Sequence, residues 1–236
     1  MKSTIQRFLR RFGWEIRRYD LAEMTRLLGF LRQHRIDCVL DVGANVGQFA
    51  TELRSTGYTG RIISFEPQRD AHAQLVAAAQ ADPLWVVAPR AAVGSAPGEI
   101  EMNISENSVS SSALPILAAH TASAPQSRYV RSERVPVIRL DDCELVDRTQ
   151  RLFIKVDTQG FEQHVLDGAT SLLNVARGVQ LETSLAPLYE GQADFHALIG
   201  QLRTAGFTPW YIDPAFQDRD TGRLLQADLT MFRPNS

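Results

Sequence analysis

A short apolar run that ends in a glycine-rich turn constrains this chain more than any other feature. Residues 38–42 (CVLDV) have the length and composition of a buried strand, and the turn 43–47 (GANVG) follows directly. Helical and strand patterns then alternate, with helices at about 45–56 and 68–81 and strands at 61–65 and 84–87. This order predicts βαβ units and a parallel sheet, because parallel strands need a crossover that a helix supplies.

The remaining chain continues this pattern and interrupts it once. Further strands are expected near 99–104, 135–140, 152–157, 178–182, 207–212 and 229–232, and helices near 161–173 and 194–205. The sheet is expected to resume at 135–140 and to end in antiparallel strands. Residues 105–127 differ, since Ser and Ala supply 12 of the 23. We interpret them as a mobile excursion, helical around 114–120, that is either a lid or a plain surface loop.

Composition describes an ordinary globular chain of 236 residues with a net charge of −2, which argues against a dedicated nucleic-acid binder. The two cysteines, Cys38 and Cys143, form neither a disulfide framework nor a zinc pattern, so a reducing compartment is expected. With no apolar run of membrane-spanning length and no secretory signal pattern, the sequence predicts a cytoplasmic protein.

Charge is concentrated at the N-terminus. Residues 1–18 hold six Lys or Arg against a single acid, Glu15, and apolar residues recur there at helical spacing. We therefore divide the chain into an N-terminal helical extension, 1–36, and one α/β domain, 37–236. The basic helix either contacts an anionic membrane surface or a lipid-linked acceptor, or packs on the domain as a cap.

The turn after the first strand is the strongest functional signal. Gly43 and Gly47 allow a sharp turn and a close approach to a ligand, and Asn45 tolerates left-handed geometry. Asp41 lies at the strand end, where its carboxylate would repel a pyrophosphate and attract a cation. Glu66, at the end of the second strand, can accept hydrogen bonds from both hydroxyls of a ribose. The combination favours S-adenosylmethionine over NAD, whose G-x-G-x-x-G pattern is absent.

Catalytic candidates follow the strand at 152–157. Lys155 and Asp157 share one side of this strand, and a buried Lys-x-Asp pair is costly unless it is paired or functional. Asp157 is the expected base or acceptor-orienting group and Lys155 its tuning partner; the alternative is a structural ion pair. Glu182 ends the next strand and can face the same cleft. His120 is a more remote candidate for a base carried by a lid, and Mg²⁺ bound by Asp157 and Glu182 is a further possibility without an assigned metal site.

Several stretches together resemble the FkbM family of S-adenosylmethionine-dependent methyltransferases. They are 41–49 (DVGANVGQF), 65–67 (FEP), 91–94 (AAVG), 135–142 (VPVIRLDD), 153–169 (FIKVDTQGFEQHVLDGA) and 179–183 (VQLET). The resemblance implies an α/β, Rossmann-like class I methyltransferase fold: a seven-stranded, mostly parallel sheet with helices on both faces and an antiparallel last strand. It implies cofactor contacts from Asp41, Gly43, Ala44, Asn45, Gly47, Phe49, Glu66, Pro67, Ala91 and Ala92, the two alanines leaving room for adenine.

One position departs from this family. Asp157-Thr158-Gln159-Gly160 stands where the family usually has Asp-x-Glu-Gly, and an amide can neither act as a base nor add charge at a metal. The resemblance itself implies O-methylation, so we predict an O-methyltransferase for a hydroxyl of a sugar, glycolipid or secondary metabolite, with a small-molecule or lipid-linked glycan as acceptor and no nucleic-acid partner. The alternatives are an NAD-dependent sugar oxidoreductase or epimerase, and a non-catalytic methyltransferase-like binding domain. The sequence predicts no oligomeric state.

Overall fold

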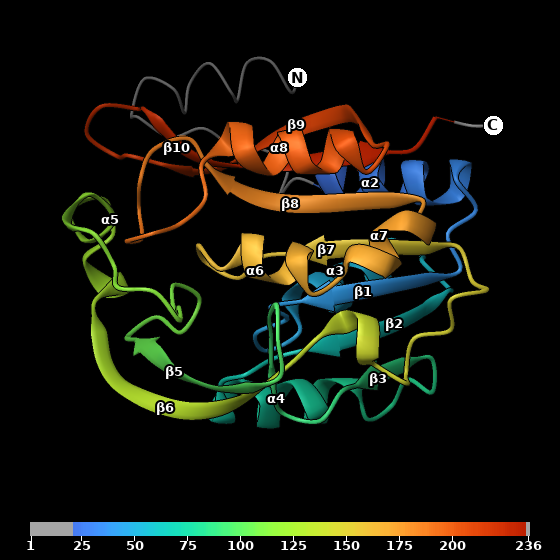
Figure 1. Ribbon diagram of the computed structural model, residues 1–236, viewed down its shortest axis with the longest axis horizontal. Helices are drawn as coiled ribbons and strands as arrows, with labels where there is room; N and C mark the ends of the chain where they lie inside the picture. Colours follow the sequence, from blue (N-terminus) through green and yellow to red (C-terminus); the bar gives the residue numbers. More distant parts are fainter. Residues whose placement is uncertain (1–20, 235–236) are drawn as a thin grey trace, which may run out of the picture.

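A seven-stranded sheet runs through the molecule in the computed structural model, which describes residues 21–234 (Figure 1). The strand order is β3-β2-β1-β7-β8-β10-β9. Its strands are β1 (Cys38–Val42), β2 (Arg61–Phe65), β3 (Trp85–Val87), β7 (Leu152–Val156), β8 (Gly178–Ser184), β9 (Thr208–Gln217) and β10 (Leu224–Phe232). β10 is antiparallel to both of its neighbours, whereas β3, β2, β1, β7 and β8 are parallel. The predicted mixed sheet with an antiparallel last strand is confirmed.

Helices cover both faces of this sheet, as predicted. One face carries α2 (Leu21–Gln33), α3 (Gln48–Ser55) and α4 (Arg69–Ala79), and the other α6 (Glu162–Asp167), α7 (Thr170–Val175) and α8 (Phe195–Thr204). Side chains alternate along each strand: Leu40 and Ile154 pack with α6–α8, whereas Val39 and Phe153 pack with α2–α4. This alternation turns Asp41 and Lys155 toward the α2–α4 face.

The N-terminal extension is described only from residue 21 onward. Leu27, Leu28 and Leu31 of α2 share one buried cluster with Val39 and Phe153 of the sheet, so this part of the extension packs into the core of the domain. The basic segment 1–18, with its proposed membrane or acceptor contact, lies outside the described residues. Within residues 21–234, no helix combines the length and apolar character needed to cross a membrane.

Three strands form a second, smaller sheet, which corrects two expectations. β4 (Ala92–Val93), β5 (Gly98–Ser105) and β6 (Tyr129–Ile138) pair in the order β4-β6-β5, and the long β5–β6 pair curves beside the main sheet (Figure 1). Residues 135–140 therefore do not resume the main sheet, and Ala91 and Ala92 do not end its third strand. The small sheet has its own apolar cluster around Met102 and Val135, so periodicity predicts a strand there but not its sheet.

The Ser- and Ala-rich excursion packs against the domain. Its helical turns are α5 (Ala118–Ser123) and η1 (Pro125–Ser127), later in the chain than the predicted 114–120. Ser110, Ser111 and Ser112 are all buried, and the Ser112 hydroxyl donates to the Gln159 carbonyl oxygen at 2.6 Å. Hydrogen bonds satisfy the polar groups of this buried segment. The segment therefore needs no apolar period, the pattern by which buried segments are identified in a sequence.

The helix expected at 161–173 is two helices. At the break, a Cβ on Gly168 would lie 2.0 Å from the Gly94 carbonyl oxygen. Asp141, in η2 (Leu140–Asp142), accepts hydrogen bonds from the backbone N–H groups of Ser171 and Leu172, both at 2.9 Å. A distant carboxylate thus caps the second helix, an interaction that local sequence cannot predict.

Candidate functional site

A cavity of about 330 Å³ opens beside the carboxyl end of the parallel strands. One end lies at the 43–47 turn, and the other lies between α2 and strands β8, β10 and β9. The predicted site residues in its lining are Gly43, Ala44, Asn45, Phe49, Glu66, Pro67, Ala91, Ala92, Lys155 and Asp157. Three other predicted site residues, Asp41, Gly47 and Glu182, lie behind this lining. We call the two parts the cofactor end and the acceptor end, after the two ligands expected from the sequence.

The backbone N–H groups of the turn are already used within the protein. The N–H groups of Gly43 and Ala44 both donate to the Phe65 carbonyl oxygen at 3.0 Å. The Asn45 N–H donates to Glu66 Oε2 at 2.7 Å, and the Val46 N–H donates to Asn45 Oδ1 at 2.8 Å. The Gly47 N–H donates to the Ala44 carbonyl oxygen at 2.9 Å. A dinucleotide-binding turn instead directs free N–H groups at a pyrophosphate. This turn has none to offer between residues 43 and 47.

Close packing explains why glycines stand at both ends of the turn. Gly43 and Gly47 have φ angles of 80° and 93°, in the region that favours glycine. A Cβ on Gly43 would lie 1.8 Å from the Asp157 carbonyl oxygen, and one on Gly47 would lie 2.8 Å from the Trp85 ring. The turn is therefore pressed against β7 on one side and against β3 on the other.

Glu66 joins the turn to the cavity. Its Oε2 accepts the Asn45 N–H at 2.7 Å and its Oε1 accepts the Gln68 N–H at 2.8 Å, so the carboxylate is held from both sides. The side chain is buried yet lines the cavity, and burial raises the pKa of Glu66 to about 7. Each oxygen keeps a lone pair that can accept a hydroxyl hydrogen bond from a nucleoside ribose.

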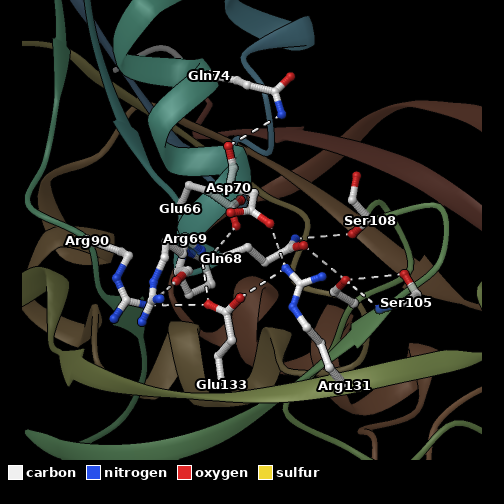
Figure 2. A network of polar contacts seen from close by, with 12 residues as sticks. Glu66, Gln68, Arg69, Asp70, Gln74, Arg90, Ser105, Ser108, Arg131 and Glu133 are labelled. Carbon is white, nitrogen blue, oxygen red and sulfur yellow. Dashed lines mark hydrogen bonds and ion pairs between the residues drawn. The ribbon is translucent and has the colours of Figure 1, made fainter.

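A polar network outside Glu66 supports the cofactor end (Figure 2). Gln68 Nε2 donates to the Ser108 carbonyl oxygen at 3.1 Å, and Ser108 Oγ accepts from Asn45 Nδ2 at 3.3 Å. The excursion that sequence analysis considered a lid or a plain loop is thus a wall beside the turn. In the sequence, a set of small polar residues is the only sign of this role.

Charged residues extend the same network between α4 and β6 (Figure 2). Glu133 of β6 accepts the Arg69 N–H at 3.1 Å, and Arg131 bridges Glu133 and Asp70 at 3.1 and 2.8 Å. Arg90 donates to the carbonyl oxygen of Pro67, itself part of the cavity lining, at 2.9 Å. The small sheet is thereby tied to the second strand–helix connection.

Lys155 lies at the centre of a three-residue charge cluster. Its Nζ is 3.2 Å from Asp41 Oδ1 and 3.5 Å from Asp157 Oδ2, and it donates to the Gly43 carbonyl oxygen at 3.2 Å. Burial works against the charge of Lys155, but Asp41 and Asp157 raise its pKa, so the ammonium persists. Asp41 is fully buried and is absent from the cavity lining, so it lies beneath the turn and contacts Lys155. Of the two carboxylates beside Lys155, Asp157 is the one that lines the cavity.

The departure at Gln159 forms an amide bridge between two carboxylates. Its Nε2 donates to Asp157 Oδ1 at 2.9 Å and to Glu182 Oε2 at 2.5 Å, while its Oε1 accepts from the Tyr189 hydroxyl at 2.7 Å. Gln226 donates to the same Glu182 oxygen at 2.8 Å. Burial and the Asp157 charge raise the pKa of Glu182. An amide can satisfy both acceptors at once, whereas a glutamate would add a third carboxylate.

A buried carboxylate that sequence analysis did not assign shapes this bridge. Glu162 Oε1 accepts hydrogen bonds from the N–H groups of Thr158 and Gly160, both at 3.0 Å, on either side of Gln159. Gln159 can then hold its positive φ of 54°, and burial raises the pKa of Glu162 to about 7. By holding the backbone on both sides of Gln159, Glu162 fixes the direction of the Gln159 side chain.

Two further hypotheses fail on geometry. No three His, Cys, Asp or Glu side chains among residues 21–234 converge as a metal site. The amide of Gln159 already donates hydrogen bonds to both Asp157 and Glu182. The residues therefore do not fit the Mg²⁺ considered above. His120 is buried against Tyr189, at 5.2 Å between ring centroids, and is absent from the cavity lining. Burial also lowers its pKa to about 4, and because the side chain does not reach the cavity it is not placed as a base above the acceptor.

The acceptor end is built from elements that sequence analysis treated as framework. Gln180 of β8, Asp228 and Thr230 of β10, and Tyr211 and Asp213 of β9 line it, opposite Met24, Arg26, Leu27 and Phe30 of α2. In the sequence, the sign of such a site is the presence of polar residues within strands of the predicted sheet, whose faces helices are expected to cover.

Comparison with known proteins identifies a family. The sequence pattern described as the methyltransferase FkbM domain matches residues 41–209, more than half of the chain. No curated protein sequence matches. Among solved structures, 1,6-didemethyltoxoflavin-N1-methyltransferase from Burkholderia thailandensis is 13% identical, with 92% of this chain and 80% of that chain covered and a TM-score of 0.46. Precorrin-6y C5,15-methyltransferase from Geobacter metallireducens is 12% identical, with 89% and 87% covered and a TM-score of 0.45.

Proposed function

Since the chain belongs to the FkbM methyltransferase family and is thus an S-adenosylmethionine-dependent methyltransferase, we propose that it methylates a hydroxyl oxygen of a small-molecule acceptor. The acceptor class we propose is a sugar, a glycolipid or a secondary metabolite. The observation that carries the proposal is the hydrogen bonding of the turn at 43–47. All of its N–H groups have partners within the protein, and one of these partners is Glu66, which lines the cavity. Such a turn suits a ribose and disfavours a phosphate.

The residues at the cofactor end fit an adenosyl donor. Glu66 offers two oriented acceptors for the ribose diol, and Ala91 and Ala92 leave a wall without bulky side chains. Phe49 lines the cavity, with the Lys155 ammonium 5.5 Å from its ring centroid. When bound, the donor supplies a methyl group on a positively charged sulfur, and the carboxylate of Asp157 is one of the acidic groups at the cavity that favour it.

Asp157 is the proposed base or orienting group for the acceptor hydroxyl. Its carboxylate lines the cavity and is held by the Gln159 amide on one oxygen and by Lys155 on the other. A carboxylate held in this way can accept the hydroxyl proton and align the oxygen for transfer. Alignment can contribute roughly 7–11 kcal/mol and a base about 10²- to 10⁴-fold in rate. Lys155 and Glu182 act through Asp157, Lys155 by charge and Glu182 through the shared Gln159 bridge.

The cavity charge supports a small molecule over nucleic acid as the partner. Among residues 21–234, six acidic side chains line it (Glu23, Glu52, Glu66, Asp157, Asp213 and Asp228) against two basic ones (Arg26 and Lys155). A polyphosphate backbone needs the opposite balance. We also propose a cytoplasmic location, which is consistent with two free cysteines. The non-catalytic alternative depended on Gln159, and the amide bridge gives that residue a role in an intact site.

Calorimetry and methyl transfer separate the two halves of this proposal. Wild type should bind S-adenosylmethionine and S-adenosylhomocysteine, and Glu66→Gln should weaken both by about 10- to 100-fold, the cost of a charged hydrogen bond. Asp157→Asn should keep affinity for S-adenosylhomocysteine within about threefold and lose about 10²- to 10⁴-fold in transfer of radiolabelled methyl to an extract.

The control is Glu99→Gln, an exposed change in β5 that should alter neither measurement. Absence of cofactor binding by wild type, or binding of NADH in its place, would contradict the proposal. Full transfer by Asp157→Asn would remove that residue from the reaction.

A further inference from the structure

Acidic side chains form a row across neighbouring strands at the acceptor end. Glu182 of β8 is paired in register with Asp228 of β10, and Asp228 is paired with Asp213 of β9. Asp157 follows the end of β7, which neighbours β8. Like charges directly opposite one another destabilise a sheet, so this row opposes folding unless each carboxylate is compensated.

Compensation is present for three of the four carboxylates. Arg26 is 3.0 Å from Asp213, the amides of Gln159 and Gln226 donate to Glu182, and Lys155 faces Asp157. Asp228 has neither a hydrogen bond nor an ion pair with any residue in the described part of the chain. It is part of the cavity lining, so the group that compensates it can be a ligand.

Gln180 provides a second, independent indication of a ligand. Its side chain is only 7% exposed and lines the same cavity, yet its buried Oε1 has no hydrogen-bond partner in the structure. It lies opposite Thr230 in the sheet, two residue pairs away from the Glu182–Asp228 pair and on the same face of the sheet. An unpartnered buried amide costs free energy comparable to a lost hydrogen bond, which a bound donor group would recover.

We propose, on the basis of the methyl transfer proposed above, that Asp228 and Gln180 form a subsite for a protonated amine on the acceptor. The acceptor would then be an amino-bearing molecule, such as an amino sugar, that is methylated at a hydroxyl beside Asp157. An ammonium has three donors and no acceptor, which suits a carboxylate and an amide oxygen that both lack donors.

Neighbouring groups disfavour an anionic acceptor at the same place. The guanidinium of Arg26 is engaged by Asp213 and lies 3.9 Å from the centre of the Tyr211 ring. Lys155 is engaged by Asp41 and Asp157. Burial, followed by repulsion from Asp157, raises the pKa of Asp228 to about 7, and a bound cation would relieve that repulsion.

Matched ligand triplets test this subsite on the full chain saturated with S-adenosylhomocysteine. The three members of a triplet share one scaffold and carry an amine, a hydroxyl or a carboxylate at the same position. The three scaffolds are methyl hexosides, cyclitols and phenylethyl compounds. Binding is measured by ligand-observed NMR and calorimetry at pH 7.5. We expect the amine to bind about 10- to 100-fold more tightly than its hydroxyl counterpart in at least one scaffold, as for a charged hydrogen bond, and the carboxylate to bind most weakly.

Variants then assign the preference to Asp228. Asp228→Asn keeps the shape and should reduce the amine preference to about twofold or less, because an amide retains only a neutral hydrogen bond. Its affinity for S-adenosylhomocysteine should remain that of wild type. Asp220→Asn removes the same charge from an exposed site between β9 and β10 and should change nothing.

The outcomes separate this inference from the proposed function. No amine preference in any scaffold, or an unchanged preference in Asp228→Asn, overturns the subsite while cofactor binding still supports a methyltransferase. Failure of wild type to bind S-adenosylhomocysteine overturns both. Weaker cofactor binding in Asp228→Asn would instead assign the carboxylate to the donor and overturn the acceptor subsite.

Discussion

The two ends of the cavity differ in whether their polar groups have partners within the protein. At the cofactor end, the N–H groups of residues 43–47 are all paired, and Glu66 is held at both oxygens. At the acceptor end, Asp228 and the Gln180 Oε1 lack protein partners within residues 21–234. The first end is complete before a ligand arrives, whereas the second leaves polar groups unsatisfied.

This difference indicates how each end recognises its ligand. A fully hydrogen-bonded turn binds by shape and by the few acceptors it exposes, so it suits one invariant donor molecule. Buried groups without partners discriminate strongly, because any ligand that fails to satisfy them pays the cost of leaving them unpaired. We therefore propose that specificity for the acceptor lies in strands β8–β10 and that the donor binds at the 43–47 turn and Glu66.

The largest expected effect tests the rigid end. In Gly43→Ala, the new Cβ would lie 1.8 Å from the Asp157 carbonyl oxygen at a φ of 80°. We expect a loss of about 4 kcal/mol or more in unfolding free energy, together with loss of S-adenosylhomocysteine binding. Denaturant unfolding and calorimetry measure the two. Gly200→Ala, in α8 with nothing within 4 Å of its Cβ, should instead gain up to about 1 kcal/mol. Equal effects would contradict the tight contact.

The second prediction tests the junction of the two ends. Lys155→Met would leave the fully buried Asp41 without its cation, which should cost about 3–5 kcal/mol in unfolding free energy. The double variant Asp41→Asn, Lys155→Met should recover part of that loss. Arg131→Met, which breaks exposed ion pairs, should cost about 1 kcal/mol or less. A Lys155→Met protein as stable as wild type would show that Lys155 does not compensate Asp41.

A pH series tests the acceptor end. Asp228 has a native pKa of about 7 against an ordinary value of 3.8, with Asp157, Glu23, Asp213 and Lys155 around it. Because the native state retains this proton where the unfolded chain releases it, the Asp228 contribution to stability is present at pH 3.5 and is lost as pH rises through about 7.

Asp228→Asn should remove this loss. Its unfolding free energy relative to wild type should therefore rise by about 2–4 kcal/mol between pH 4 and pH 8. Denaturant unfolding across that range measures it, and Asp220→Asn should show no such trend. A difference that stays constant with pH would indicate that Asp228 is not buried among charges.

The smallest expected effect concerns Arg26 at the acceptor end. Arg26 pairs with Asp213 at 3.0 Å and covers the Tyr211 ring, but its side chain is partly exposed. Arg26→Met should therefore cost only about 0.5–1 kcal/mol in thermal unfolding. Removing this cation should also tighten binding of the amine ligands relative to their hydroxyl counterparts. A weakened amine preference would indicate that Arg26 positions the acceptor.

Local pattern predicted the framework better than its boundaries or partners. The apolar runs at 38–42 and 61–65 match β1 and β2 in full, since buried parallel strands are continuous and hydrophobic. The run at 135–140 also lies largely in a strand, β6, but that strand pairs with β5 in another sheet. Pairing depends on residues distant in the sequence, so periodicity alone could not assign it.

The sequence by itself determined the turn at 43–47 and the place of Glu66, because a glycine turn between a strand and a helix and a carboxylate after the next strand are local features. Tertiary structure alone decided the acceptor end. Asp228, Gln180 and Gln159 come together only through the pairing of β8 with β10 and the placement of the loop after β7. Whether a carboxylate is compensated depends on neighbours across strands, and those neighbours are set by the fold.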